Sequence, residues 1–210
     1  MLRFLIMALI VFFAVSLTAN PFSFSVRSGV IIPDNEEYDS GVISGLTVNY
    51  YFNPAWELQL SFDYHRQSMT ASRKIINPSN PHTALPKVPS EVTLTYIPVS
   101  LNLQYNVALD SRIKPILGGG IGLGFLNEDI SILDPDYINN YRVFESYSGL
   151  NTIVWTGLKY DLNSRIDILS QIMYRYSRMS ETIDLNPHGH LKEVETINGL
   201  GANLGFEYRF

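Results

Sequence analysis

The sequence predicts an all-β fold, an eight-stranded antiparallel up-and-down transmembrane β-barrel that is preceded by a cleaved signal peptide. Three observations lead to this prediction. An uninterrupted apolar run opens the chain, apolar and polar residues alternate at period two through most of the remaining residues, and short connections alternate with long ones. The alternation continues to the last residue, because Leu204, Phe206, Tyr208 and Phe210 are separated by small or charged residues. Such a period of two indicates strands with one apolar and one polar face.

The apolar run covers residues 4–15 and comes after a single cation, Arg3. It is too short to span a bilayer as a helix, and it has the length of a signal-peptide core. A buried N-terminal helix is the alternative interpretation. We expect cleavage after Ala19, with cleavage after Ser16 as the competitor. The predicted organisation is a signal peptide over residues 1–19 and a barrel domain over residues 20–210.

The composition is that of an envelope protein. Of 210 residues, 12% are aromatic, 17% are charged and none is cysteine. Soluble domains typically carry about a quarter charged residues, and aromatic residues gather where a membrane protein meets the bilayer surface. Lys and Arg total 15 against 20 for Asp and Glu. This acidic balance argues against nucleic acid as a partner, and no residue pattern calls for a cofactor.

Eight segments have the alternation expected of strands. They are residues 22–31, 41–52, 56–67, 91–107, 114–126, 148–160, 165–177 and 197–210. The fourth changes phase near Ile97 and Pro98, which predicts a β-bulge there. The fifth has glycine at 118, 120, 122 and 124, a file that would leave room inside a narrow barrel. The sixth is irregular, since Ile153 and Trp155 would point inward.

The connections between these segments fall into two classes that alternate strictly. Short ones are expected at 53–54, 110–111 and 161–164, and long ones at 33–40, 68–90, 127–147 and 178–195. This is the pattern of a membrane barrel with short periplasmic turns and long outer loops.

The polarity of the two faces favours a membrane barrel over a soluble one. Bare charges cannot lie in an apolar cavity, since each costs several kcal/mol, but they can pair within a lumen. We therefore expect a polar network inside the barrel. Its predicted members are Arg27, Glu57, Asp63, Asp167, Arg175 and Glu207. Closure of the first strand onto the last predicts an ion pair between Arg27 and Glu207, with Asn203 as the alternative partner of Arg27.

Histidines are the remaining candidates for chemistry. We expect His65 to be hydrogen-bonded to Asp63 on the inner face of its strand. Some eight-stranded barrels modify lipid A with a His and a Ser, but their His-x-Ser-Asn arrangement does not occur here. His188 and His190 have no carboxylate or thiolate at a fixed spacing, so a solvated loop is favoured over a metal site.

Several stretches resemble those of small bacterial outer-membrane β-barrel proteins, the group of the opacity, OmpX and OmpW-type proteins. They are Val26–Gly29, Tyr96–Tyr105, Lys114–Gly122, Gly157–Leu162 and Tyr174–Ser177. The resemblance spans about the whole mature chain and implies the outer membrane of a Gram-negative bacterium. It also implies that the terminal aromatics are a signal for the barrel-assembly machinery. These residues are Phe206, Tyr208 and Phe210.

The resemblance specifies the fold better than the function. The expected function is that of a structural and surface-interaction protein, adhesin-like, acting through four extracellular loops around a lumen filled by side chains. A narrow porin-like channel for small or hydrophobic solutes is the alternative, since the glycine file locally empties the lumen. A lipid A-modifying enzyme is the remote alternative, and no enzyme is expected. The expected partners are outer-membrane lipid, lipopolysaccharide, which Arg73, Lys74 and Lys87 could contact, and host or surface ligands.

Overall fold

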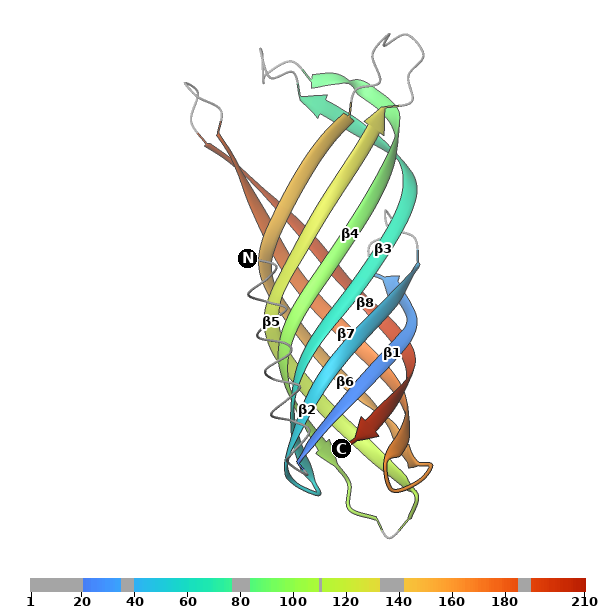
Figure 1. Ribbon diagram of the computed structural model, residues 1–210. Coiled ribbons are helices and arrows are strands. Elements are labelled where there is room, and N and C mark those ends of the chain that lie inside the picture. Colours follow the sequence, from blue (N-terminus) through green and yellow to red (C-terminus); the bar gives the residue numbers. More distant parts are fainter. Residues whose placement is uncertain (1–20, 35–39, 77–83, 110, 133–141, 185–189) are drawn as a thin grey trace.

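The computed structural model describes residues 21–34, 40–76, 84–109, 111–132, 142–184 and 190–210. They form a tall closed barrel of eight tilted strands, with the C-terminus at the end that carries the short turns (Figure 1). The strands are β1 (Phe22–Pro33), β2 (Gly41–Asn53), β3 (Trp56–Ile76), β4 (Ala84–Asn106), β5 (Ile113–Ile132), β6 (Arg142–Asp161), β7 (Ile166–Asp184) and β8 (His190–Arg209). The predicted eight-stranded antiparallel barrel is therefore confirmed. Residues 1–20, with the predicted cleavage site at Ala19, lie outside the described residues.

Each strand pairs antiparallel with its neighbour in sequence, and β1 closes the barrel by pairing with β8. From one strand to the next round the barrel, the paired positions shift along the strands. Followed from Ser25 through β2 to β7, the pairing arrives at Ile197 of β8, whereas Ser25 pairs directly with Glu207. These two residues are ten positions apart, which is the stagger that closure of a tilted barrel requires. In the described part of the chain, no helix is long and apolar enough to span a membrane.

The short turns are built as expected, with asparagine as the organising residue in two of them. The Asn53 side-chain oxygen accepts from the backbone N–H groups of Ala55 and Trp56, at 2.9 and 3.0 Å. Asn163 does the same for Arg165 and Ile166, at 2.9 Å each. Such side-chain-to-backbone bonds fix tight turns. Arg165, the first residue of the predicted seventh segment, belongs to this turn and is exposed.

The strands are longer than predicted, and the outer connections are shorter. β1 and β2 have 12 and 13 residues, but β3 to β8 have 19 to 23. A transmembrane strand needs only about 9–11 residues. Much of the predicted loops 68–90, 127–147 and 178–195 is therefore strand. Six strands continue well past β1 and β2, as Figure 1 shows.

One part of the barrel, the belt half, carries the apolar outer surface. It extends from the short turns to the outward-facing Tyr64, Phe125 and Tyr176. Its outer face exposes large apolar side chains on every strand. Among them are Val26, Leu46, Leu60, Leu101, Ile121, Val154, Ile172 and Leu204. Its inner face is largely polar, with buried Ser, Thr, Asn, Gln and charged residues. A transmembrane barrel requires this polarity, because lipid surrounds it.

The other part, the loop half, has the opposite polarity. Its outer face begins with Arg66, Asn127 and Arg178, all exposed. Its interior holds a buried apolar cluster. The cluster consists of Met69, Val92, Leu94, Tyr96, Leu126, Ile130, Tyr147, Met179 and Ile197. This is the polarity of a soluble barrel, and it indicates that water surrounds the loop half.

The inversion accounts for the apparent phase change in β4, and the predicted β-bulge at Ile97–Pro98 is wrong. Tyr96 pairs with Leu126 and Val99 with Leu123, so β4 keeps one register against β5 through this point. Val92, Leu94 and Tyr96 are buried, as are Ser100 and Asn102 on the same inward face. The strand does not turn over. Its inward residues change from polar to apolar instead.

The belt half has its own small apolar cluster, in which Ile43 of β2 meets side chains of β5, β6 and β7 across the lumen. It comprises Ile43, Ile116, Ile153, Trp155, Leu169 and Met173, so the predicted inward position of Ile153 and Trp155 is correct. The glycine file makes room for such side chains. A Cβ at Gly118 would lie 2.3 Å from the Trp155 ring, and one at Gly120 would lie 1.8 Å from the Asn102 amide oxygen. The file is filled by side chains from both neighbouring strands.

Candidate functional site

The lumen of the belt half is crossed by two clusters of charged side chains. All six residues of the predicted polar network are buried. The structure divides them between the clusters. Arg27, Asp63 and Arg175 form the middle cluster, and Glu57, Asp167 and Glu207 belong to a lower cluster near the short turns.

The middle cluster is built around one carboxylate. The Arg27 guanidinium reaches Asp63 with Nη2 at 2.8 Å from Oδ1 and Nε at 3.2 Å from the same oxygen. Arg175 donates from Nη2 to the other oxygen, Oδ2. Arg175 belongs to β7 and Asp63 to β3, which are four strands apart in either direction round the barrel. This contact therefore joins opposite walls.

Gly45 decides the partner of Arg27, and the predicted ion pair between Arg27 and Glu207 is wrong. Gly45 lies in register between Arg27 and Asp63. A Cβ at this position would be 2.0 Å from Asp63 Oδ1 and 3.2 Å from Arg27 Nε. Without that side chain, the arginine can extend sideways to β3. Glu207 pairs in register with Ser25, one inward position below Arg27.

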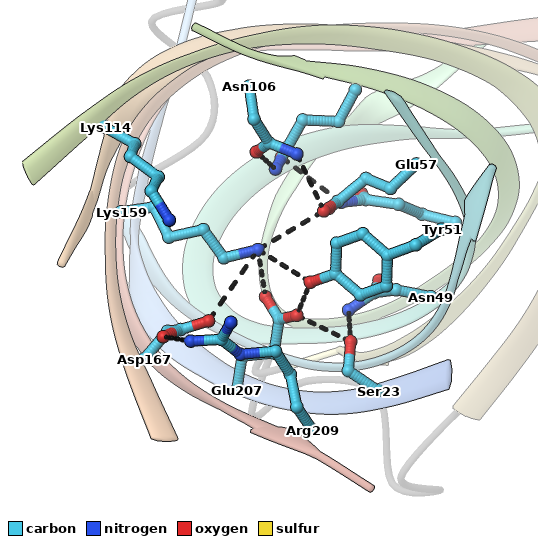
Figure 2. Close-up of polar contacts among 12 residues, drawn as sticks. Ser23, Asn49, Tyr51, Glu57, Asn106, Lys114, Lys159, Asp167, Glu207 and Arg209 are labelled. Atoms are coloured by element: carbon cyan, nitrogen blue, oxygen red, sulfur yellow. Dashed lines mark hydrogen bonds and ion pairs between the residues drawn. The ribbon is translucent and has the colours of Figure 1, made fainter. Parts of the chain in front are cut away.

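The lower cluster is centred on Lys159, whose ammonium is ringed by acceptors (Figure 2). Its Nζ lies 2.8 Å from Glu207 Oε2, 3.3 Å from Glu57 Oε2 and 4.0 Å from Asp167 Oδ2. It also donates to the Tyr51 hydroxyl at 2.8 Å. Lys159 on β6 and Tyr51 on β2 come from opposite walls. The lower lumen is thus bridged at a second height.

Glu207 also accepts hydrogen bonds from two neutral groups of the same cluster. It accepts from the Ser23 hydroxyl at 2.6 Å and from the Tyr51 hydroxyl. Asn49 in turn donates to Ser23 at 2.9 Å (Figure 2). Glu57 accepts from Gln59 and, at 3.2 Å, from Asn106. Each carboxylate is fixed by neutral donors as well as by Lys159.

A ring of charges at the periplasmic mouth surrounds this cluster. Arg209 contacts Asp167 and lies 3.5 Å from Asp161 Oδ1. Lys114 binds the other oxygen of Asp161 at 2.6 Å. Lys114, Asp161 and Arg209 are partly exposed, so water screens the pairs that Asp161 makes, and these contribute little to stability. Their position fits the turn end of the barrel, where the chain leaves the membrane.

Neutral hydrogen bonds close the space between the charged clusters and the apolar cluster of the loop half. The Tyr96 hydroxyl donates to Asn151 Oδ1 at 3.0 Å and contacts the Ser177 hydroxyl. Asn151 donates to Ser100 at 2.7 Å. Nearer the turns, Trp155 Nε1 donates to Gln104 at 3.0 Å. Three strands, β4, β6 and β7, are thereby tied together across the lumen.

Among the histidine and cation candidates, the structure describes side-chain contacts for His65 alone. His65 is not bonded to Asp63 as predicted. Its ring nitrogens face the Val42 carbonyl at 3.0 Å and Gln67 at 3.2 Å, because Asp63 is taken by two arginines. His188 lies outside the described residues. Arg73, Lys74 and Lys87 lie on the outer ends of β3 and β4, where only the backbone register is described.

Two central residues of the lower cluster were missed from the sequence. Lys159 lies between the outward Leu158 and Tyr160, so its inward position followed from alternation. Tyr51 stands between Tyr50 and Phe52 in an aromatic run and gave no polar signal. Lys159 supplies the one buried cation near Glu57 and Glu207 in the described lumen.

The comparisons with known proteins agree with this architecture. The chain belongs to the family of the outer membrane protein beta-barrel domain, whose model matches residues 9–210. It is therefore a protein of the outer membrane. No curated protein has significant sequence similarity to it.

Three solved structures illustrate the likeness of fold. Neisserial surface protein A is 14% identical, with a TM-score of 0.57 and coverage of 90% of this chain and 96% of that one. OprG from Pseudomonas aeruginosa is 17% identical, with a TM-score of 0.57 and coverage of 91% and 97%. Ail from Yersinia pestis, crystallised with the heparin analogue sucrose octasulfate, is 17% identical, with a TM-score of 0.51 and coverage of 90% and 96%.

Proposed function

We propose that the protein is a structural and surface-interaction protein of the outer membrane, adhesin-like, whose working surface is the loop half and whose lumen is closed. The observation that carries this proposal is the pair of charged clusters that join opposite walls at two heights. Arg175 meets Asp63, and Lys159 meets Glu57 and Glu207. Buried ion pairs are costly to open, because each separated charge is left without a partner.

Conductance in a planar bilayer tests the closed lumen. The refolded protein should give no current steps above the lipid baseline. A double variant, Arg175→Ala with Lys159→Ala, removes both crossings and should leak. Ile121→Ala on the lipid face is the matched control and should stay silent. Steady conductance by the unmodified protein would contradict the closed lumen and favour the narrow-channel alternative, which the glycine file of β5 supports.

The β3–β4 hairpin supports a more specific proposal about the interaction surface. No acidic residue lies between Asp63 and Glu91, although the chain as a whole has a net charge of −5. In the register of β3 and β4, Lys74 is directly opposite Lys87 and Arg73 is opposite Val88. Like charges placed opposite each other destabilise a strand pair. A polyanion would relieve this repulsion, so the proposed partner is a phosphorylated or sulfated glycan.

Two binding measurements separate the sources of that glycan. Protein in lipid nanodiscs is titrated with a heparin oligosaccharide, and in parallel with lipopolysaccharide micelles. At low salt, the double variant Lys74→Gln with Lys87→Gln should bind the preferred one of these two glycans more weakly than the unmodified protein does. This difference in affinity should shrink as salt is raised. Lys114→Gln, at the periplasmic mouth, is the matched control with unchanged binding. Equal binding by all three proteins in both arms would reject the hairpin as the contact surface.

A further inference from the structure

The Arg175 guanidinium is buried, but only part of it is hydrogen-bonded. Its side chain has 0% exposure. Asp63 accepts from Nη2, but Nε and Nη1 have no hydrogen-bond partner among the residues that the structure describes. A donor of a charged group that is buried and left unpaired destabilises the folded state. Tyr96 is a neighbour of this guanidinium, with its ring centroid 5.9 Å from Arg175 Cζ.

The middle cluster also has an excess of positive charge. Two guanidinium groups, Arg27 and Arg175, share the single carboxylate of Asp63. The other buried carboxylates of the belt half, Glu57, Glu207 and Asp167, lie in the lower cluster, where Lys159 contacts all three and Arg209 also contacts Asp167. Within the middle cluster, two cations therefore share one carboxylate, and the negative charge that balances the second cation lies in the lower cluster, where Lys159 and Arg209 face three carboxylates.

We propose that the middle of the lumen binds one small monovalent anion of the halide class, held by the free N–H groups of Arg175. One such anion makes the cluster neutral, with two cations and two anions. It also accepts the hydrogen bonds that Asp63 does not take, and guanidinium groups are well suited to anions because their donors are fixed in a plane. The side chains that fill the lumen favour a compact ion over a polyatomic one.

Crystals grown in sodium bromide give the most direct test. Bromide scatters anomalously, so it is distinguished from water at the same place. The expected result is an anomalous peak within hydrogen-bonding distance of Arg175 Nε or Nη1. Water at both nitrogens, with bromide peaks confined to exposed cations such as Lys114, would overturn the proposal.

Unfolding in lipid vesicles gives a second, independent measurement. At fixed ionic strength, exchange of gluconate for bromide should raise the urea midpoint of the unmodified protein, because a ligand that binds the folded state stabilises it. Arg175→Met leaves Arg27 and Asp63 as a neutral pair and should lose this shift, with apparent bromide affinity weakened at least about tenfold. Lys114→Met is the matched control and should keep the shift.

The same experiment remains decisive if Arg175→Met fails to fold. Arg175→Lys keeps the charge but has a single ammonium in place of the planar fork, and it should weaken the bromide effect without removing the cation. Identical bromide dependence in the unmodified protein and both Arg175 variants would exclude the site.

Discussion

The belt half and the loop half are one continuous barrel with opposite polarity. In β5, the outward residues change from Ile121, Leu123 and Phe125 to Asn127, while the inward residues change from glycine to Leu126 and Ile130, with the buried Glu128 between them. The same change occurs in β4 at Thr95, the register partner of Asn127, and in β7 between Tyr176 and Arg178. The strand ladder itself is uninterrupted through the transition in β5 and β6.

This difference shows that the solvent outside the barrel sets the polarity within it. Lipid surrounds the belt half, so apolar side chains lie outward, and the lumen can hold paired charges. Water surrounds the loop half, so its stability depends on an apolar interior like that of any soluble domain. The two halves should therefore respond in opposite ways to the same kind of substitution.

The largest effect is expected from the middle cluster. Asp63→Leu leaves Arg27 and Arg175 buried without their carboxylate, and loss of one partner of a buried ion pair typically costs about 3–5 kcal/mol. Urea unfolding in lipid vesicles measures the change. Adding Arg27→Met and Arg175→Met to the same chain should recover much of the loss. A triple variant less stable than Asp63→Leu alone would contradict this electrostatic explanation.

A slightly smaller effect is expected from the interior of the loop half. Leu126 has 0% exposure within the apolar cluster, and truncation of a buried Leu to Ala typically costs about 2–5 kcal/mol. Leu123→Ala removes the same atoms from the lipid face of the same strand and should cost less. The urea midpoints of both variants decide the point. Equal losses would mean that Leu126 is not packed as a core residue.

Charges on the outer face should distinguish the two halves. Ile121→Lys places a cation on the apolar surface of the belt half and should destabilise by about 2–4 kcal/mol. Asn127→Lys, on the same face of β5 in the loop half, should stay within about 0.5 kcal/mol. Refolding yield and unfolding in vesicles measure both. Similar losses at the two positions would place the membrane boundary elsewhere.

The smallest effect on the free energy of unfolding is expected at the C-terminus. The effect there on the amount of protein in the outer membrane should be larger. The Phe210 ring lies 5.5 Å from that of Tyr208, and the Phe210 N–H donates to the Phe22 carbonyl at 3.3 Å. Full burial of a Phe is worth about 1.5–3 kcal/mol. If the terminal aromatics are an assembly signal, deletion of Phe210 should reduce the amount of outer-membrane protein far more than Phe125→Ala does. Immunoblots of membrane fractions compare the two, and equal reduction would refute the signal.

The sequence was sufficient for the fold because alternation, turn residues and connection lengths are local signals. It was insufficient for strand length, because the interior of the loop half breaks the polar-inside rule on which the assignment relied. Val92, Leu94 and Tyr96 therefore appeared as a phase change in β4 when they were inward residues in a different solvent. These residues would have been found by looking for strands whose inward positions change from polar to apolar without a shift in register.

Alternation predicted six charged residues of the lumen but missed Lys159 and Tyr51, and it did not predict how the charges pair. Alternation placed Arg27, Asp63 and Glu207 inside, yet the partner of Arg27 depends on the missing side chain of Gly45 and on contacts across the barrel. Contacts between opposite walls, such as that of Arg175 with Asp63, join residues far apart in sequence. No local pattern encodes them.

The position of the bilayer on β5 tests most directly whether lipid surrounds one half of the barrel and water the other. The chain has no cysteine, so one cysteine per variant carries a spin label at a time, at residues 121, 123, 125, 127, 129 and 131. Accessibility to oxygen reports lipid, and accessibility to a polar nickel chelate reports water. We expect oxygen contact through residue 125 and nickel contact from residue 127 onward. Oxygen contact that continues to residue 131 would contradict the division into two halves, because lipid would then surround the loop half as well.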